Sequence, residues 1–150
     1  MQTGDALMSQ DPMVTLKELI KNNISVKKDD NVTPAAVLTE IEFPESKLED
    51  FFATYDLIVT VGRVEERDQM IGFNVVATVG TYRIGVWSVD RPGNTGWKTR
   101  YKGLQEIRRI FREFMSGSYR VHRRSRDDDK LFGAKKLYHT IHTVEYWSFN

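Results

Sequence analysis

The sequence predicts an α+β domain: an antiparallel-dominated sheet with a long β-hairpin, one amphipathic helix packed across it and a short N-terminal helix. The longest β-like run spans Phe73–Asp90, and a second alternating run, Asp56–Val64, precedes it across a short charged segment. Strands on either side of such a segment pair antiparallel. The third observation is the helical apolar pattern between Lys98 and Met115, which one face of a sheet can bury.

Length and composition favour a single domain over residues 1–150, with residues 1–10 flexible. A chain of 150 residues, 40% hydrophobic and 29% charged, is long enough to bury a core of its own. No apolar run approaches the roughly 20 residues that cross a bilayer, and the N-terminus lacks the basic and apolar stretches of a signal peptide. We therefore expect a protein made in the cytoplasm, with no membrane partner. The absence of cysteine excludes disulfides and thiolate metal ligands.

The first quarter of the chain contains a helix and then a strand. Asp11-Pro12 is a typical helix start, with Asp as N-cap and Pro at the first helical position. Leu16, Leu19 and Ile20 then share one stripe at helical spacing. After a polar connector, Ala36–Phe43 alternates as a strand does and Pro44 ends it; Glu45–Ala53 can form a helical turn or two.

The hairpin is expected to run from Asp56 to Asp90. In this prediction Asp56–Val64 is the outgoing strand, Glu65–Gln69 is the charged tip, and the return strand follows. The apolar positions of the return strand change parity at Gly80-Thr81. Such a change requires either a bulge in one long strand or a tight turn between two shorter ones, and we prefer the bulge.

The second half of the chain is expected to close the sheet. The helical stripe consists of Leu104, Ile107, Ile110, Phe111 and Phe114, and Gly117 is a natural C-terminal cap. The remaining elements predicted are a loop at Arg91–Gly96, a helix over roughly Lys98–Met115, a strand at Tyr119–Arg126, a turn or longer loop at Asp127–Asp129 and a last strand at Leu137–Phe149.

Charge is unevenly distributed along the chain. Residues 1–90 hold eight basic and fifteen acidic side chains, a formal charge of −7, whereas residues 91–150 hold fourteen and six, a charge of +8. This asymmetry fits a basic face for a polyanion or an acidic face that meets a basic one. It also fits opposite charges that neutralise each other across one folded surface.

The basic segment YRVHRRSR is the main candidate for recognition. It contains Arg120, Arg123, Arg124 and Arg126, with an aromatic residue and a histidine between them. Such residues can bind phosphates and stack on bases. On a regular strand Arg120, His122, Arg124 and Arg126 would share one face and Arg123 the other. The segment could contact nucleic acid, face a DNA-filled lumen, bind a neighbouring protein, or be a solvated strand.

No pattern of catalytic or metal-binding residues is present. Asp127–Asp129 lacks the spacing of a calcium loop, and adjacent carboxylates do not converge on one ion. His139 and His142 fall on opposite faces of a strand, so they cannot share a zinc ion there. The glycines match no nucleotide-binding fingerprint, and no serine lies in a nucleophile elbow. We therefore expect a protein that is not an enzyme, with no catalytic residue, metal or cofactor.

The element order resembles that of the tail-terminator and tail-completion (neck) proteins of tailed phages and related viruses. In that family an N-terminal helix precedes a long hairpin, a helix crosses the sheet, and two strands close it. The phrase YRIGVWSVD, followed by a loop and KGLQEIRRIFREFM, resembles the family's passage from strand to helix. The resemblance covers about residues 12–150; residues 24–53 are longer than the family pattern.

The resemblance implies a virion structural protein located in the tail or neck. It implies a homo-oligomeric ring, commonly a hexamer, that terminates the tail tube or joins it to the head connector, with DNA passing through the lumen. Such a ring uses heterologous contacts, in which one surface meets a different surface of the neighbour. The residues expected at the oligomer or partner interface are Glu65, Glu66, Arg67, Asp68, Arg108 and Arg112. The alternative function is a small nucleic-acid-binding module that uses the basic strand around residues 119–126.

Overall fold

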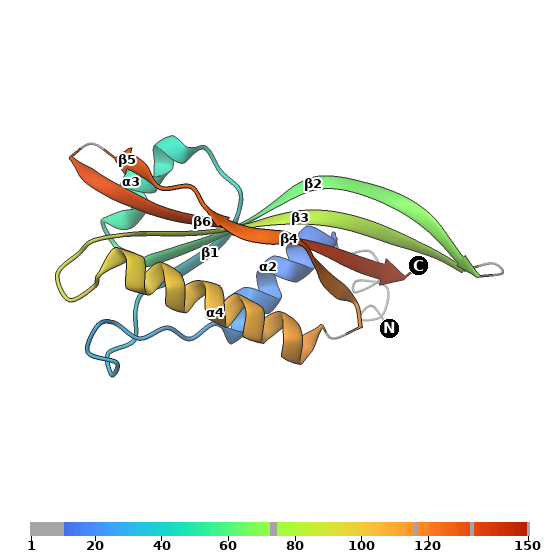
Figure 1. Ribbon diagram of the computed structural model, residues 1–150, viewed down its shortest axis with the longest axis horizontal. Helices are drawn as coiled ribbons and strands as arrows, with labels where there is room; N and C mark the ends of the chain where they lie inside the picture. Colours follow the sequence, from blue (N-terminus) through green and yellow to red (C-terminus); the bar gives the residue numbers. More distant parts are fainter. Residues whose placement is uncertain (1–10, 73–74, 116, 133, 150) are drawn as a thin grey trace, which may run out of the picture.

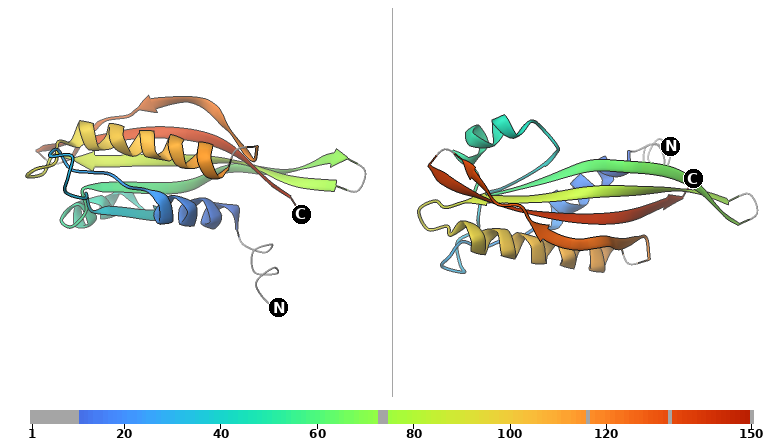
Figure 2. Two further views of the ribbon diagram at one scale, coloured as in Figure 1. Left: turned by 90° about the horizontal axis from the view of Figure 1, so that it is seen from below. Right: turned by 45° about the horizontal axis from the view of Figure 1, so that its top comes forward.

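The computed structural model contains one twisted sheet with two helices on one face and a short helical segment over one end of the other (Figures 1 and 2). The structure describes residues 11–72, 75–115, 117–132 and 134–149. Within these ranges the elements, in chain order, are α2 (Pro12–Asn23), β1 (Val37–Ile41), the 3₁₀ turn η1 (Glu45–Lys47), α3 (Leu48–Phe52), β2 (Leu57–Gly72), β3 (Val75–Val89), α4 (Gly96–Phe114), β4 (Tyr119–Asp127), β5 (Lys130–Phe132) and β6 (Lys135–Phe149).

The strands lie in the order β1-β2-β3-β6-β4, with β5 also beside β6. β1 pairs parallel with β2, from Val37 opposite Leu57 to Ile41 opposite Val61. All other pairings among the described strands are antiparallel. The predicted α+β class with an antiparallel-dominated sheet is therefore confirmed. Residues 24–53 supply an additional edge strand, β1, and the helical crossover through η1 and α3 that a parallel pair requires.

α4 packs across the sheet as predicted, because its apolar stripe meets apolar residues of the central strands. Gly103 permits the close approach, since a Cβ there would lie 2.9 Å from Leu57 Cδ2. α2 joins the same face, and the Asp11 side chain caps it by accepting a 2.9 Å hydrogen bond from the Met13 amide. The buried residues of this main core include Leu16, Ile20, Val59, Val61, Tyr82, Ile84, Val86, Ile107, Ile110 and Phe111.

The opposite face is covered only near one end of the sheet in the described part of the chain. There Leu48 and Phe52 of η1–α3 pack on Trp87 and its neighbours in a second, smaller core. The right-hand view of Figure 2 shows α3 and α4 on opposite sides of the sheet. The middle of this face carries mostly polar side chains, such as Thr81, Arg83 and Thr143, which is common for an antiparallel sheet. At its far end Ala77 and Val79 are buried.

The predicted hairpin tip is wrong. Glu65–Gln69 lies inside β2, which runs on to Gly72 and pairs these five residues with Ala77–Thr81 of β3. Charged side chains are tolerated there because both faces of this part of β2 reach solvent. β2 ends at Gly72 and β3 begins at Val75, so Phe73, the first residue of the longest β-like run in the sequence, lies outside the described residues.

The predicted bulge at Gly80 is wrong, because the irregularity lies on the partner strand β2. β3 is one continuous strand, as preferred, and its pairing with β6 runs without a shift from Ala77 to Val89. The register changes instead in β2 between Arg63 and Glu65, which makes Val64 the extra residue. Gly80 has a different role: the ring of Tyr82 lies over it, and a Cβ at Gly80 would be 2.3 Å from the Tyr82 hydroxyl.

The acidic turn is shorter than predicted. Asp127 closes β4, and β5 begins at Lys130, a strand that the sequence analysis did not predict. Asp129 is not simply solvated, because its carboxylate accepts a 3.0 Å hydrogen bond from the His139 amide and pairs with Arg100. These contacts fix β5 and the turn against β6.

Candidate functional surface

The end of the sheet that projects past the helices is the most distinctive surface of the molecule. Figure 1 shows β2 and β3 extending well beyond the ends of α2 and α4. We call this region the wing and define it as residues 62–72 of β2, 75–82 of β3 and 144–149 of β6. Strands of 16 and 15 residues form its hairpin, against a usual length of about 5–6. Among the described helices, α2 and α4 reach only the base of the wing, where Tyr82 and Val144 belong to the main core (Figure 1).

One face of the wing is tied to the start of α2. The Tyr82 hydroxyl donates a 2.8 Å hydrogen bond to Glu66, and burial together with this bond raises the pKa of Tyr82. The Arg63 guanidinium pairs with both Glu66 and the capping carboxylate of Asp11. Hydrogen bonding from Arg63 is the main reason why the pKa of Asp11 is lowered. This network fixes the angle at which the wing leaves the body.

The other face of the wing holds a buried carboxylate. The side chain of Glu145 is only 2% exposed, and it accepts hydrogen bonds from Arg120 at 3.1 Å and from the Trp147 indole at 3.2 Å. Burial alone would raise the pKa of Glu145, but the hydrogen bond and positive charge of Arg120 outweigh it and the pKa is lowered. Arg120 thereby links the edge strand β4 to β6.

A shallow hollow of about 230 Å³ lies between the wing and the body on the same face. Arg83 and Arg126 line it, together with polar groups of Thr81 and Thr143. Arg83 donates bidentate hydrogen bonds to Glu42, the shortest at 2.6 Å. Glu42 can lie over the sheet there because Gly62 has no side chain. The remaining lining residues are Val64, Glu65 and Ile141.

Two strand edges are open in the described part of the sheet. β1 pairs with β2 only as far as Val61, so the outer edge of β2 from Gly62 to Gly72 has no strand beside it. The outer edge of β4, Tyr119–Asp127, is the other margin of the sheet and also has none. Both edges expose apolar side chains: Val64 is 52% exposed and Val121 is 51% exposed.

The predicted interface residues divide into two groups. Glu65, Glu66, Arg67 and Asp68 are brought together on the wing. Arg108 and Arg112 lie on α4, across the sheet from the hollow, and Arg108 is partly buried with a 3.3 Å hydrogen bond to Ser125. Glu66 lies on the face of the sheet that α4 covers and Glu65 on the opposite face, so the six predicted residues do not share one surface.

The predicted basic row on β4 is only partly correct. Arg120 pairs with Glu145 and Arg126 with Ile141, positions that lie on the same face of β6. Register shifts after Val121 and after Arg123 interrupt the alternation, so the regular four-residue row predicted from strand periodicity is wrong. Arg123 stands opposite Thr143 in the backbone pairing. Arg124 and Arg126 are exposed, and within the described residues neither has an ion pair.

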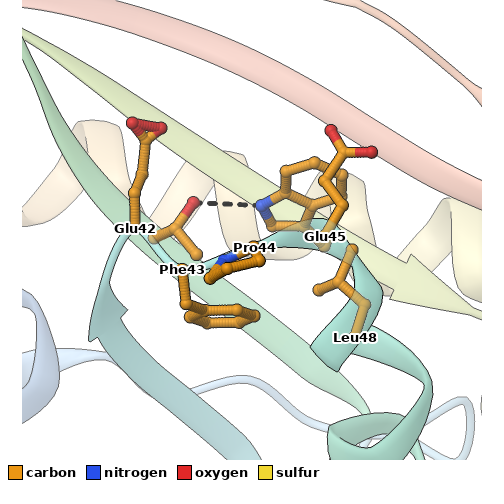
Figure 3. A pocket seen from close by; sticks show the side chains of 7 residues that line it. Glu42, Phe43, Pro44, Glu45 and Leu48 are labelled. Carbon is orange, nitrogen blue, oxygen red and sulfur yellow. Dashed lines mark hydrogen bonds between the residues drawn. The ribbon is translucent and has the colours of Figure 1, made fainter.

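A second cavity, of about 400 Å³, was not predicted (Figure 3). Glu42 and Glu45 stand at its rim, and the Trp87 indole donates a 3.0 Å hydrogen bond to the Thr60 hydroxyl inside it. On β6, the His139 imidazole stacks on Trp87 with 3.4 Å between ring centroids. Burial lowers the pKa of His139 to about 4. This pair could not be predicted from the sequence, because only the register of β3 and β6 brings the two residues together.

The histidines and acidic residues of the described ranges do not gather into a metal site. His139 and His142 lie on opposite faces, as predicted, since they oppose Trp87 and Ile84 of β3. No group of three or more His, Cys, Asp or Glu side chains among the described residues could hold a metal ion. None of the described helices is both long and apolar enough to cross a membrane.

Comparison with known proteins does not assign the chain to a family. The sequence matches no protein-family model, and a search of curated proteins also finds no match.

Proposed function

We propose that this protein is a virion structural protein of the tail or neck, which assembles into a homo-oligomeric ring that terminates the tail tube or joins it to the head connector. The observation that carries the proposal is the wing, whose outer β2 edge has no partner in the described chain. An open strand edge presents unpaired N–H and C=O groups and pairs readily with another chain. A wing that protrudes past the helices is suited to reach a neighbouring subunit.

The architecture supports the proposal, because it has the elements that the resemblance implies in the order that it implies. α2 precedes the β2–β3 hairpin, α4 crosses the sheet, and β4 and β6 close it. This agreement is one of element order, and many functions can share a fold. The wing adds an independent reason to expect self-assembly.

A ring is favoured over a two-fold dimer because the two open edges differ. The free part of β2 carries Glu65, Glu66 and Asp68 against Arg63 and Arg67, a net charge of −1. β4 carries four arginines against Asp127, a net charge of +3. Two unlike surfaces produce heterologous contacts, and these close into a ring when the rotation between subunits permits it. In this proposal the tail tube and the head connector bind the two ends of the ring, and DNA passes through its lumen.

Light scattering combined with negative-stain imaging, at low and high salt, tests the proposal. We expect ring-shaped particles whose mass is a multiple of 17.4 kDa and whose stability falls with salt. A monomer at every salt and protein concentration would contradict the proposal.

A nucleic-acid-binding module is the second candidate, and one observation favours it. Arg124 and Arg126 are exposed without an ion pair in the described chain, so their charges are available to phosphates. Binding of a short DNA duplex that weakens steeply with salt, and that is lost when both arginines are replaced by Ala, would support this function. Equal affinity of the variant and the native protein would exclude it.

A further inference from the structure

We propose that the open edge of β2, residues 62–72, pairs antiparallel with the open edge of β4, residues 119–127, in a second copy of this chain. The inference rests on the proposed ring function and names the surfaces through which adjacent subunits meet. The two edges lie along opposite margins of the sheet, as the right-hand view of Figure 2 shows. The sheets of successive subunits would thus join into one continuous sheet.

Strand direction makes this pairing antiparallel without any adjustment. β2 is antiparallel to β3, β3 to β6, and β6 to β4, so β2 and β4 run in opposite directions within one sheet. Two copies placed side by side in the same orientation therefore bring β2 of one against β4 of the next in antiparallel fashion. Same-orientation copies are what a cyclic ring contains.

The strand registers show that the edges are level with each other. Val121 opposes Val144, Val144 opposes Tyr82, and Tyr82 opposes Arg63, so Val121 and Arg63 share a row. By the same route Tyr119 shares a row with Glu66. Without a shift only the start of β4 meets the free β2 edge, because Arg126 shares a row with Thr60, beside which β1 already lies. A stagger of the kind found in closed sheets would lengthen the overlap toward Gly72.

The side chains on the two edges are complementary in charge. The β4 edge exposes Arg124 and Arg126, and the β2 edge exposes Glu65 and Asp68. Opposite charges across strands favour pairing and like charges oppose it. A stagger that brings Val121 opposite Asp68 also brings Arg126 opposite Glu65, and each of these pairs lies on one face of the sheet.

The lack of native cysteines makes disulfide cross-linking a clean test. The main variant is Asp68→Cys combined with Val121→Cys, two exposed positions on the same face of the sheet, which tests the staggered register. Arg63→Cys with Val121→Cys tests the level register. Lys98→Cys with Val121→Cys is the matched control, since Lys98 is exposed on α4 away from both edges. Each variant is oxidised at a concentration where light scattering detects oligomers, and is then analysed on a denaturing gel.

The inference predicts a ladder of covalent oligomers, up to the full ring, from one or both edge pairs and none from the control pair. A mixture of the Asp68→Cys and Val121→Cys single variants should give covalent dimers only. Oligomers without edge cross-links would overturn the edge pairing and leave the ring function standing. Covalent dimers from Asp68→Cys alone would overturn it in favour of two β2 edges that pair with each other. The absence of both oligomers and cross-links would overturn both proposals.

Discussion

The Arg120 guanidinium donates a 3.1 Å hydrogen bond to the buried Glu145 carboxylate, and this contact joins the edge strand β4 to β6. The two partners differ in environment: Glu145 is almost fully buried, whereas the Arg120 side chain is 67% exposed. The cost of burying a carboxylate is therefore offset in part by a cation that remains in contact with water. This arrangement also means that Arg120 has a structural role that Arg124 and Arg126 lack.

Arg120→Ala is expected to destabilise the fold by about 1–2 kcal/mol, because it weakens the compensation of a buried charge. This loss of stability is smaller than the loss expected for a fully buried ion pair, because the Arg120 side chain is largely solvated. Urea denaturation at neutral pH measures the change. Arg124→Ala is the matched control and should stay within about 0.5 kcal/mol of the native protein. Equal stability of the two variants would show that Arg120 does not support Glu145.

Gly80→Ala is expected to destabilise the protein by about 1–3 kcal/mol, since the added methyl overlaps the buried Tyr82 ring. The ring cannot move aside easily, because its hydroxyl is bound to Glu66. Thermal unfolding followed by circular dichroism provides the measurement. Gly72→Ala, where a Cβ would meet nothing within 4 Å, should change stability by less than about 0.5 kcal/mol. A Gly80→Ala protein as stable as the Gly72→Ala protein would contradict the packing seen here.

The sequence predicted the elements well wherever side-chain periodicity determines them. The stripe of Leu104, Ile107 and Phe111 identified α4, and Asp11-Pro12 identified the start of α2. Charge was a poor guide to turns. Glu65–Gln69 has the composition of a loop but continues a strand, because local composition does not reveal that β3 supplies a partner for each residue.

The open edge of β2 and the buried groups near it could not be predicted from one sequence. The open edge of β2 exists because β1 is short and ends its pairing at Val61. The burial of Glu145 and the stacking of Trp87 on His139 follow from registers between strands that are about 50 residues apart in the chain. The bulges of β4 displaced the predicted basic row, and bulges have no clear sequence marker without a glycine.

Stability is expected to fall between pH 6.5 and pH 4, where His139 and His142 are kept neutral by burial. Burial lowers the pKa of each to about 4, from about 6.5 in the unfolded chain. The unfolded state therefore binds more protons in this window, so stability is full above pH 6.5 and is lost as pH falls toward 4. The loss is on the order of 2–3 kcal/mol per histidine. Urea midpoints at pH 7, 5.5 and 4.5 test it.

The two histidines face different groups, so a variant of one of them can separate their contributions to this pH dependence. His139 faces Trp87 and the charges of Asp128 and Lys130, and His142 faces Ser125 and Arg108. His139→Phe keeps a ring on Trp87 and should reduce the pH slope by about half while the native fold is retained. The carboxyl groups whose pKa is lowered lose their contribution below about pH 5, so the interval from pH 7 to pH 5.5 reports on the histidines. An unchanged slope in this variant would contradict the assignment.

Reversal of charges on the two open edges tests how subunits recognise each other. Glu65→Lys with Asp68→Lys should raise the dissociation constant of the oligomer at least tenfold, about 1.4 kcal/mol, because it places like charges opposite Arg124 and Arg126. Arg124→Glu with Arg126→Glu should weaken assembly to a similar degree. The protein carrying all four changes should recover much of the affinity, since the charges are then exchanged rather than removed. Sedimentation velocity at low salt gives the dissociation constants.

Glu49→Lys with Asp50→Lys, on the exposed side of α3, is the control and should leave assembly unchanged. Failure of the fourfold variant to recover would mean that the acidic and basic edges do not meet.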